Sequence, residues 1–227
     1  MSGAGIVTID GPSGSGKGTI SRAVARQVHW HLLDSGALYR LVALAGLENG
    51  LRPDDISGHS RLAASMEMSF GTGADGGERV TLCGRDVTLE VRSEIAGQGA
   101  SRVAAWPQVR SALLERQRAF RRPPGLVADG RDMGTVVFPD APLKIFLTAT
   151  LAERALRRYK QLKDKGSDVS LPALSREIAE RDLRDSTRKA SPLKAAPDAL
   201  VIDSTELAID AVVDRVLLLG RNGSLWS

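Results

Sequence analysis

The chain has 227 residues, of which 42% are hydrophobic and 26% charged, and it carries a net charge of +4 at pH 7. This length suits one α/β domain or a core with an insertion, and the composition is that of a globular protein. Aromatic residues make up only 4% of the chain, which argues against a surface that stacks single-stranded nucleic acid. The single cysteine, Cys83, excludes an internal disulfide and fits a reducing compartment.

The sequence carries no signal for membrane insertion or export. No stretch reaches the roughly 18 apolar residues of a membrane helix, and the N-terminus lacks the basic and apolar regions of a secretion signal. We therefore expect a cytoplasmic protein with no membrane contact. Its basic balance fits polyanionic small ligands or nucleic acid equally well.

The first elements of the chain predict a phosphate-binding loop. The β-branched run at 6–9 predicts a buried strand, and residues 20–28 predict a helix. A glycine-rich turn between a strand and a helix lets backbone N–H groups converge on an anion. Lys17 would then reach the outer phosphates of a nucleoside triphosphate. The turn consists of Gly11, Pro12, Ser13, Gly14, Ser15, Gly16, Lys17, Gly18 and Thr19.

The residue after Lys17 departs from the usual phosphate-loop pattern. The hydroxyl residue that normally binds Mg²⁺ at this position is replaced by Gly18, and Thr19 follows it. Two interpretations stay open. Either Thr19 binds the metal ion, or phosphates and water hold it.

The next part of the chain predicts helices around a small antiparallel insertion. Turns at 73–77 and at 84–86 would connect its strands. The elements that we expect are a strand at 30–33, helices at 37–47 and within 51–65, strands at 66–70 and 79–82, and helices at 91–105 and 107–120.

Strands and helices then alternate to the end of the chain. Five strands separated by helices imply a parallel sheet that is covered on both faces. Ligands bind at the carboxyl ends of the strands in such sheets. The remaining expected elements are strands at 126–129, 144–147 and 199–202, and helices at 151–165, 171–188 and 207–219.

Asp129 ends one of these strands, at the edge of the sheet that also carries the phosphate loop. It is therefore a candidate for holding Mg²⁺, directly or through water. The alternative interpretation is an aspartate that caps a helix or a turn.

Two helices carry arginines at helical spacing, so that each set shares one face. Arginine binds phosphate bidentately and can neutralise the charge of a transferred phosphoryl group. Spacing alone fits a solvated, salt-bridged face equally well. The sets are Arg154, Arg157 and Arg158 on the first helix, and Arg181, Arg184, Asp185 and Arg188 on the second.

Three longer runs resemble the bacterial cytidylate kinases, a family of nucleoside monophosphate kinases. They are His31-Leu32-Leu33-Asp34-Ser35-Gly36-Ala37-Leu38-Tyr39-Arg40, the run from Ala128 to Pro139, and the run from Arg181 to Arg188. Together with the phosphate loop, the resemblance covers essentially the whole chain. It implies a three-layer P-loop α/β fold whose five-stranded parallel sheet has the order 2-3-1-4-5. It also implies a core at 1–35, 120–150 and 190–227, a monophosphate-binding domain enlarged by the β insertion at about 36–119, and a short lid at about 151–189.

The resemblance also implies roles for individual residues. Those that would carry the transfer are Lys17, Arg131, Arg157 and Arg188. Those that would hold ATP are Gly11 to Thr19 with Arg154, Arg157 and Arg158 of the lid. On the acceptor side, Ser35 would seat CMP, and Arg40 would contact its phosphate with Arg131 and Arg188 nearby. The residues that would read cytosine are Ser101, Arg110 and Asp132. The residues that would hold the ribose are Arg181 and Asp185.

The function implied is transfer of a phosphoryl group from ATP, with Mg²⁺, to CMP or dCMP. We expect a monomer with small-molecule nucleotides as partners and no nucleic acid. One alternative is another nucleoside monophosphate kinase, which would take UMP or AMP. A nucleotide-dependent switch is a further alternative, but the chain lacks the Asn-Lys-x-Asp motif of guanine-binding switches.

Overall fold

The computed structural model describes residues 4–72, 78–164 and 166–226. The chain divides into two compact units: the first is Met1–Asp34 with Gln117–Ser227, and the second is Ser35–Arg116. The turn expected at 73–77 lies outside the described residues. Among the helices that are described, none is long and apolar enough to cross a membrane.

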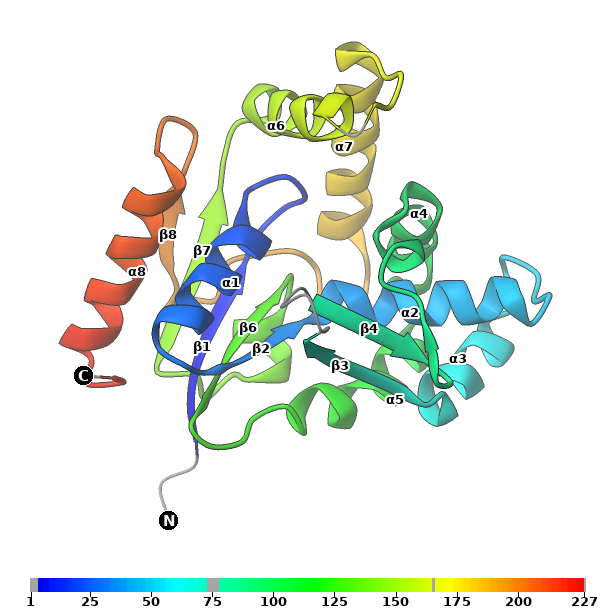
Figure 1. The fold of residues 1–227 in the computed structure, drawn as a ribbon, viewed down its shortest axis with the longest axis horizontal. Coiled ribbons are helices and arrows are strands. Elements are labelled where there is room, and N and C mark those ends of the chain that lie inside the picture. The colour runs from blue at the N-terminus through cyan, green and yellow to red at the C-terminus, as the bar shows by residue number, and fades with distance from the viewer. Residues whose placement is uncertain (1–3, 73–77, 165, 227) are drawn as a thin grey trace. The chain divides into compact units, whose positions relative to one another are not determined.

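A five-stranded parallel sheet forms the centre of the first unit (Figure 1). Its order is β2-β6-β1-β7-β8. Counted along the chain as core strands, this is 2-3-1-4-5, so the predicted sheet and its order are confirmed. The strands are β1 (Gly5–Asp10), β2 (His31–Asp34), β6 (Gly125–Gly130), β7 (Leu143–Thr148) and β8 (Leu200–Asp203).

Helices and turns of the first unit surround this sheet. Their order along the chain follows the predicted alternation of strands and helices. They are α1 (Lys17–Gln27), η2 (Met133–Val137, a short π-helical turn), α6 (Leu151–Asp164), α7 (Leu171–Thr187) and α8 (Ile209–Asn222).

The two faces of the sheet are covered by different elements. Side chains alternate along a strand, so Val7 and Ile9 of β1 point to one face, where they join a buried apolar core with residues of α1 and α8. Thr8 and Asp10 point to the opposite face, where η2 packs against β1 and β6. The phosphate loop follows the carboxyl end of β1. It therefore lies at the edge of the sheet, between the face that α1 and α8 cover and the face that η2 covers.

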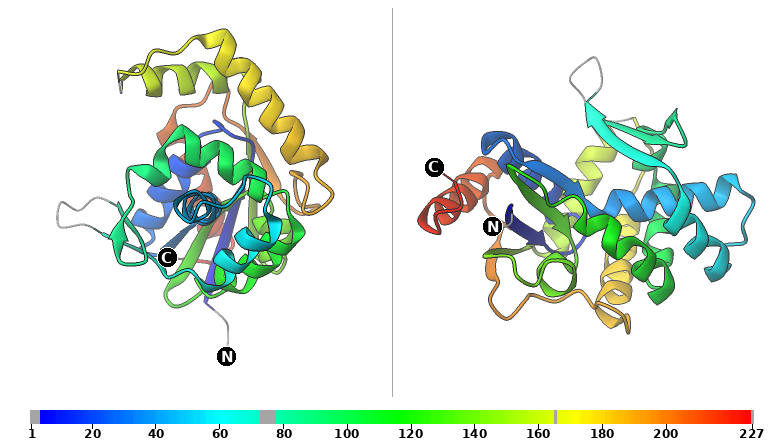
Figure 2. Two further views of the ribbon diagram at one scale, coloured as in Figure 1. Left: turned by 90° about the vertical axis from the view of Figure 1, so that its right-hand side faces the viewer. Right: turned by 90° about the horizontal axis from the view of Figure 1, so that it is seen from below.

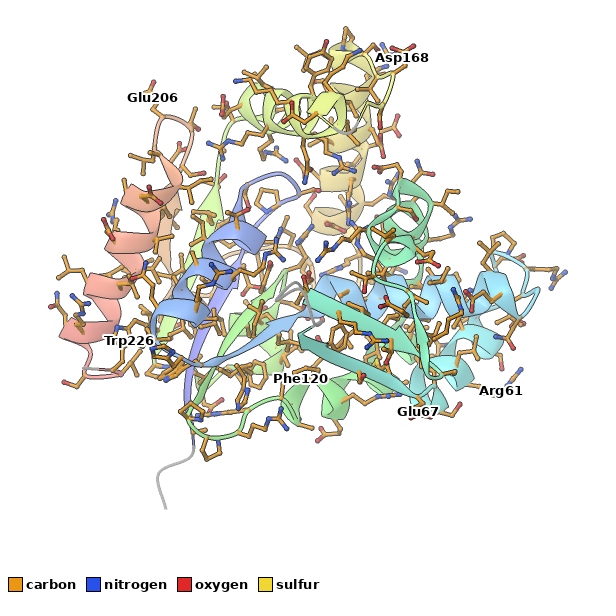
Figure 3. All side chains as sticks on the ribbon, in the orientation of Figure 1. Arg61, Glu67, Phe120, Asp168, Glu206 and Trp226 are labelled. Atoms are coloured by element: carbon orange, nitrogen blue, oxygen red, sulfur yellow. The ribbon has the colours of Figure 1, made fainter. Side chains whose placement is uncertain are left out.

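Helices α6 and α7 pack against each other beyond the carboxyl edge of the sheet. Figure 3 shows Asp168 in their connection, at the end of the pair away from the sheet. At the amino ends of the strands, the rings of Trp30 and Trp226 meet edge to face with centroids 5.2 Å apart. This aromatic contact fixes the C-terminal segment after α8 to the sheet.

The second unit combines helices with a three-stranded antiparallel sheet, so the predicted β insertion is confirmed. Figure 2 shows the arrows of its two longer strands, at 68–72 and 78–82, which pair antiparallel. Most of α5 belongs to this unit, and its last two residues belong to the first. The elements are α2 (Ser35–Glu48), α3 (Ile56–Ser65), β3 (Met68–Thr72), β4 (Glu78–Leu82), β5 (Arg85–Asp86), η1 (Glu90–Arg92), α4 (Glu94–Val103) and α5 (Pro107–Arg118).

Three local predictions differ from the structure. The helix expected at 91–105 is interrupted, because η1 ends at Arg92 and α4 begins at Glu94, after the capping side chain of Ser93. Arg85 and Asp86, expected in a turn, form the short strand β5, and the turn consists of Cys83 and Gly84 with φ of 49° and 78°. Two successive residues with positive φ match the twist of a tight hairpin. Helix α1 begins at Lys17 rather than at residue 20, because Gly16, at φ 90°, caps it in a left-handed conformation.

Candidate phosphate-binding site

The glycine-rich loop places the start of α1 at the carboxyl edge of the sheet. Gly11 permits the close approach that this requires, since a Cβ there would lie 2.0 Å from the carbonyl oxygen of Leu147. The helix begins directly after Gly16, so Lys17 is its first residue. The N–H groups of the first helical turn and the positive end of the helix dipole therefore face the loop, an arrangement that binds anions.

Lys17 is buried at the centre of this loop, with 8% of the residue exposed. Its Nζ donates a hydrogen bond to the carbonyl oxygen of Pro12 at 3.1 Å. Burial, together with the nearby positive charges of Arg131 and Arg181, lowers the pKa of Lys17 to about 7, against the charges of Asp129 and Asp34. A phosphate that entered the loop would restore the charged ammonium.

Two carboxyl groups end neighbouring strands beside Lys17. Asp34 of β2 and Asp129 of β6 are register partners. Burial raises the pKa of Asp129 to about 6, and the charge of Asp34 adds to this effect while that of Lys17 opposes it. The sequence prediction included Asp129 but missed Asp34, whose signal was its position at the end of a strand.

Gly18 explains part of the unusual loop pattern. A Cβ at this position would lie 3.2 Å from Oδ2 of the buried Asp129, so the absence of a side chain at Gly18 avoids crowding that carboxyl group. Thr19 is exposed in the first turn of α1. No cluster of three or more His, Cys, Asp or Glu side chains suited to a metal ion occurs among the described residues. A metal ion at this edge would therefore need phosphate or water ligands as well as a carboxylate.

Two of the three predicted arginines of α6 contact the phosphate loop. Arg154 donates to the carbonyl oxygen of Ser13 at 3.0 Å, and its other Nη pairs with Asp182 at 2.6 Å. Arg157 donates to the carbonyl oxygen of Ser15 at 3.3 Å. The hydrogen bond of Arg158 instead runs along its own helix, to Gln161 at 2.8 Å.

Ser204, which follows β8, joins this network and was missed by the sequence prediction. Its Oγ donates to the carbonyl oxygens of Thr148 at 3.0 Å and Ser15 at 3.2 Å. Arg157 donates from Nη1 to Oγ of Ser204 at 3.1 Å and from Nη2 to its carbonyl oxygen. A hydroxyl residue at the carboxyl end of a core strand was the only sequence signal for this contact.

A second buried group of charges joins the turn after β6 to the end of α7. Nε of Arg131 donates to Asp185 at 3.1 Å. Arg188 lies between two carboxyl groups, 3.9 Å from Asp185 and 4.0 Å from Asp132. Burial of the Asp185 carboxyl would raise its pKa, but the charges of Arg131, Arg181 and Arg188 outweigh this effect and hold the pKa below its usual value. Arg184, predicted on the same helical face, is exposed, while Asp185 is buried.

Asp10 is a further buried carboxyl group, and the sequence prediction missed it. It ends β1, directly before the loop, and its two oxygens accept hydrogen bonds from the N–H groups of Met133 and Gly134 at 2.8 Å each. Burial raises the pKa of Asp10 to about 7, and these two bonds oppose the rise.

The other predicted acceptor residues belong to the second unit. Ser35 is buried as the first residue of α2, and Arg40 donates to two backbone carbonyls at 3.2 and 3.1 Å. Arg110 lies with its guanidinium carbon 5.5 Å from the centre of the Tyr39 ring. Within the described part of the chain, the buried hydroxyl of Ser101 has no hydrogen-bond partner. A buried polar group of this kind is costly unless a ligand or water satisfies it.

The sheet, the glycine-rich loop at a helix N-terminus and the buried lysine define a P-loop protein that binds nucleotide phosphates. The sequence signature of cytidylate kinase matches residues 7–222. The chain therefore belongs to the cytidylate kinase family, whose members are kinases that transfer a phosphoryl group.

Individual relatives agree with this assignment. A cytidylate kinase of Pseudomonas aeruginosa (strain UCBPP-PA14) is 58% identical over 214 residues, which cover 93% of each chain. A cytidylate kinase of Methylococcus capsulatus (strain ATCC 33009 / NCIMB 11132 / Bath) is 56% identical over 212 residues, which cover 93% of this chain and 95% of that one. Among solved structures, a shikimate kinase from Bacteroides thetaiotaomicron aligns over 95% of this chain and 97% of its own, with a TM-score of 0.46 and 12% identity. This last likeness adds nothing to the family assignment.

Proposed function

We propose that this chain transfers the γ-phosphoryl group of ATP to CMP, giving ADP and CDP. One juxtaposition in the first unit supports this function beyond family membership. Lys17 of the phosphate loop lies close enough to Arg131 and Arg181 for their charges to lower its pKa. Buried cations crowded together at the carboxyl edge of a sheet suit a polyanion that bridges them, such as the phosphates of two nucleotides.

The phosphate loop would hold the donor. The N–H groups and Lys17 would bind the phosphates of ATP, and Arg154, Arg157 and Arg158 of α6 would cover them as part of a lid formed by α6 and α7. Arg154 and Arg157 already reach the backbone of the loop, which supports their role. The loop residues from Gly11 to Thr19 complete this subsite.

The transfer would be an in-line displacement. An oxygen of the acceptor phosphate attacks the γ-phosphorus as its bond to the bridging oxygen breaks, and ADP leaves. No general base is required, because the second pKa of a phosphate monoester is about 6 and the acceptor is already anionic at neutral pH. Lys17, Arg131, Arg157 and Arg188 would stabilise the charge on the phosphoryl group during transfer.

The second unit would act as the monophosphate-binding domain, with Ser35 and Arg40 seating the acceptor and Ser101 and Arg110 contacting the base. The unsatisfied hydroxyl of Ser101 supports a polar ligand at this position. Arg110 would donate to N3 and O2 of cytosine.

The first unit would supply the remaining acceptor contacts. Asp132 would accept a hydrogen bond from the exocyclic amine of cytosine, whereas uracil would present a carbonyl oxygen to it. Since an unmet buried polar group costs about 1–3 kcal/mol, we expect a roughly tenfold to hundredfold preference over UMP. Arg181 and Asp185 would hold the ribose. We expect that binding does not require the 2′-hydroxyl group, so that the site would accept dCMP as well.

The residues at this edge fit a magnesium ion. Carboxylate oxygens are the protein ligands that Mg²⁺ prefers, and the Asp129 carboxyl group lies beside Gly18 of the loop. We infer that Asp129 would hold the ion directly or through water, with the exposed Thr19 as a further candidate. When bound, Mg²⁺ neutralises phosphate charge. The single cysteine fits a reducing compartment, and we infer a cytoplasmic monomer with nucleotides as its ligands.

The first experiment is an ADP-release assay with ATP and Mg²⁺ on a panel of CMP, dCMP, UMP, AMP and GMP. We expect the highest kcat/KM on CMP, with dCMP close behind, and loss of turnover when EDTA removes the metal ion. Preference for UMP or AMP would retain the phosphotransfer chemistry and reject the assigned base contacts. Binding of ATP without transfer to any acceptor would favour a nucleotide-dependent switch.

A further inference from the structure

Asp10 is a buried carboxyl group with no part in the function proposed above. Only 5% of the residue is exposed. It follows the apolar run of β1 and immediately precedes Gly11, the first residue of the phosphate loop. Its side chain points to the face of the sheet that η2 covers, away from the core with α1 and α8.

Both oxygens of Asp10 hold the backbone of the turn after β6. Oδ1 accepts a hydrogen bond from the N–H of Met133, and Oδ2 accepts one from the N–H of Gly134, each at 2.8 Å. These two residues directly follow Arg131 and Asp132, and they begin η2. The first N–H groups of a helical turn have no acceptor within the turn. Asp132 occupies the N-cap position of η2, but its side chain makes no capping hydrogen bond there. Asp10 therefore supplies acceptors that the turn itself does not.

The contact between this turn and β1 is close as well as polar. A Cβ at Gly134 would lie 2.9 Å from Oγ1 of Thr8, which points to the same face as Asp10. The turn is therefore seated directly on the strand that leads into the phosphate loop. Asp10, which lies 123 positions before Met133 in the sequence, fixes the position of this turn.

We propose that Asp10 is a positioning residue that sets the orientation of Arg131 and Asp132 relative to the phosphate loop. In this role it determines how well the acceptor nucleotide is bound and read, although it is a neighbour of the donor-binding loop in sequence. This role rests on the proposed function of Asp132 and Arg131 at the CMP subsite. Burial raises the pKa of Asp10, while the two N–H bonds favour its charged form, so the carboxylate depends on this contact.

The test compares Asp10→Asn and Asp10→Ala with the wild type. An asparagine offers one acceptor oxygen and an NH₂ group that cannot accept, so one of the two N–H bonds is lost. Alanine loses both. We expect the KM for CMP to rise about tenfold in Asp10→Ala, with a smaller rise in Asp10→Asn, because each lost bond to a charged acceptor weakens the placement of the turn. The ratio of kcat/KM for CMP to that for UMP should fall in the same order, while the KM for ATP stays within about twofold.

Two further variants separate this role from a structural one and from the function on which it rests. Thr8→Val is the matched control, since it changes a buried residue on the same face of β1 without removing a hydrogen bond to the turn, and we expect it to leave the CMP to UMP ratio unchanged. Asp132→Ala is the benchmark. If Asp132→Ala lowers the ratio and both Asp10 variants do not, the role of Asp10 is rejected and the proposed function stands. If Asp132→Ala also leaves the ratio unchanged, the base-reading role of Asp132 and the role of Asp10 fail together.

A measurement without substrates covers the case in which Asp10→Ala does not fold. In Asp10→Asn, hydrogen exchange should be at least about tenfold faster than in the wild type at whichever of the Met133 and Gly134 amides has lost its acceptor, with amides of β1 unchanged. Exchange at the wild-type rate at both of these amides would overturn the role of Asp10. An equal rise in the KM values for ATP and CMP, or a loss of stability alone, would overturn it as well.

Discussion

The phosphate loop and the charge cluster of Arg131, Asp132, Asp185 and Arg188 are built in different ways. In the loop, backbone carbonyl groups make the contacts: Lys17 donates to that of Pro12, five residues away, and Arg154, Arg157 and Ser204 donate to those of Ser13 and Ser15. The cluster depends on side chains far apart in sequence: Arg131 and Asp185 are 54 residues apart. A site of the first kind is fixed by its backbone, and a site of the second kind by the mutual attraction of its charges. Substitutions in the loop should therefore change chemistry alone, whereas those in the cluster should change chemistry and stability together.

Lys17→Met gives the largest expected effect on the loop. We expect kcat to fall about 10³-fold, because the cation next to the transferred phosphoryl group is lost. The free energy of unfolding should stay the same or rise, since a buried ammonium is replaced by an apolar chain of similar length. Steady-state kinetics and urea unfolding measure the two effects.

Lys144→Met is the matched control for this substitution. Lys144 is also buried in the first unit, but its ammonium pairs with Asp198 at 2.8 Å. It lies near the amino end of β7, whereas the loop lies at the carboxyl edge of the sheet. We expect this variant to lose stability and to keep its kcat. Turnover near the wild-type value in Lys17→Met would contradict the assigned role of the loop lysine.

Asp185→Ala should break the cluster. The substitution leaves Arg131 and Arg188 without their shared carboxylate, and removing one partner of a buried ion pair costs about 3 kcal/mol. The KM for CMP should rise in parallel. Urea unfolding measures the loss of stability, and kinetics with CMP measure the rise in KM. The control is Arg184→Ala, a substitution of an exposed residue on the same helix, which should alter the free energy of unfolding by less than about 0.5 kcal/mol. A stable Asp185→Ala variant with weak CMP binding would mean that the cluster does not depend on its ion pairs.

The pH dependence of stability should reveal the environment of Lys17. Its pKa is about 7 in the folded protein, chiefly because of burial, and near 10.5 when unfolded. Between these values the unfolded chain binds more protons, so the free energy of unfolding of the nucleotide-free protein rises with pH, by up to about 5 kcal/mol in total. The difference between the wild type and Lys17→Met, measured by urea unfolding from pH 7 to pH 10, isolates this contribution. A difference that is constant with pH would mean that Lys17 is fully charged in the empty site.

Ser204→Ala should have the smallest effect. Its hydroxyl bonds to the backbone of Ser15 and Thr148, but Arg154 and Arg157 bond to the loop backbone as well. We expect a loss of about 1 kcal/mol in the free energy of unfolding and a rise of about twofold to fivefold in the KM for ATP. A much larger loss would show that the loop, like the cluster, depends on distant residues.

Local patterns in the sequence were sufficient for most of the fold. Apolar β-branched runs predicted the five parallel strands, and the glycine-rich run at 11–19 predicted the turn between β1 and α1, because both signals lie within a few neighbouring residues. The order of the strands came only from the resemblance to a known family, since the spacing of strands does not determine which of them pair.

The contacts of the candidate site were less predictable. Asp10 and Ser204 act on backbone groups 123 and 189 residues away, and a sequence pattern carries no information on such encounters. Helical spacing placed Arg184 with Asp185, but spacing gives direction around the helix axis and not depth. The end of α7 is buried along a narrow strip that includes Asp185 and excludes Arg184.

The bond between Lys17 and Pro12 has a consequence for the entropy of nucleotide binding. A lysine side chain loses about 2 kcal/mol of rotamer entropy when it is fixed in one conformation. In this protein the chain folds with the ammonium already held by a carbonyl oxygen of the loop. An incoming phosphate therefore replaces one acceptor by another on an ordered side chain, and most of the ordering of Lys17 takes place during folding, before any nucleotide is present.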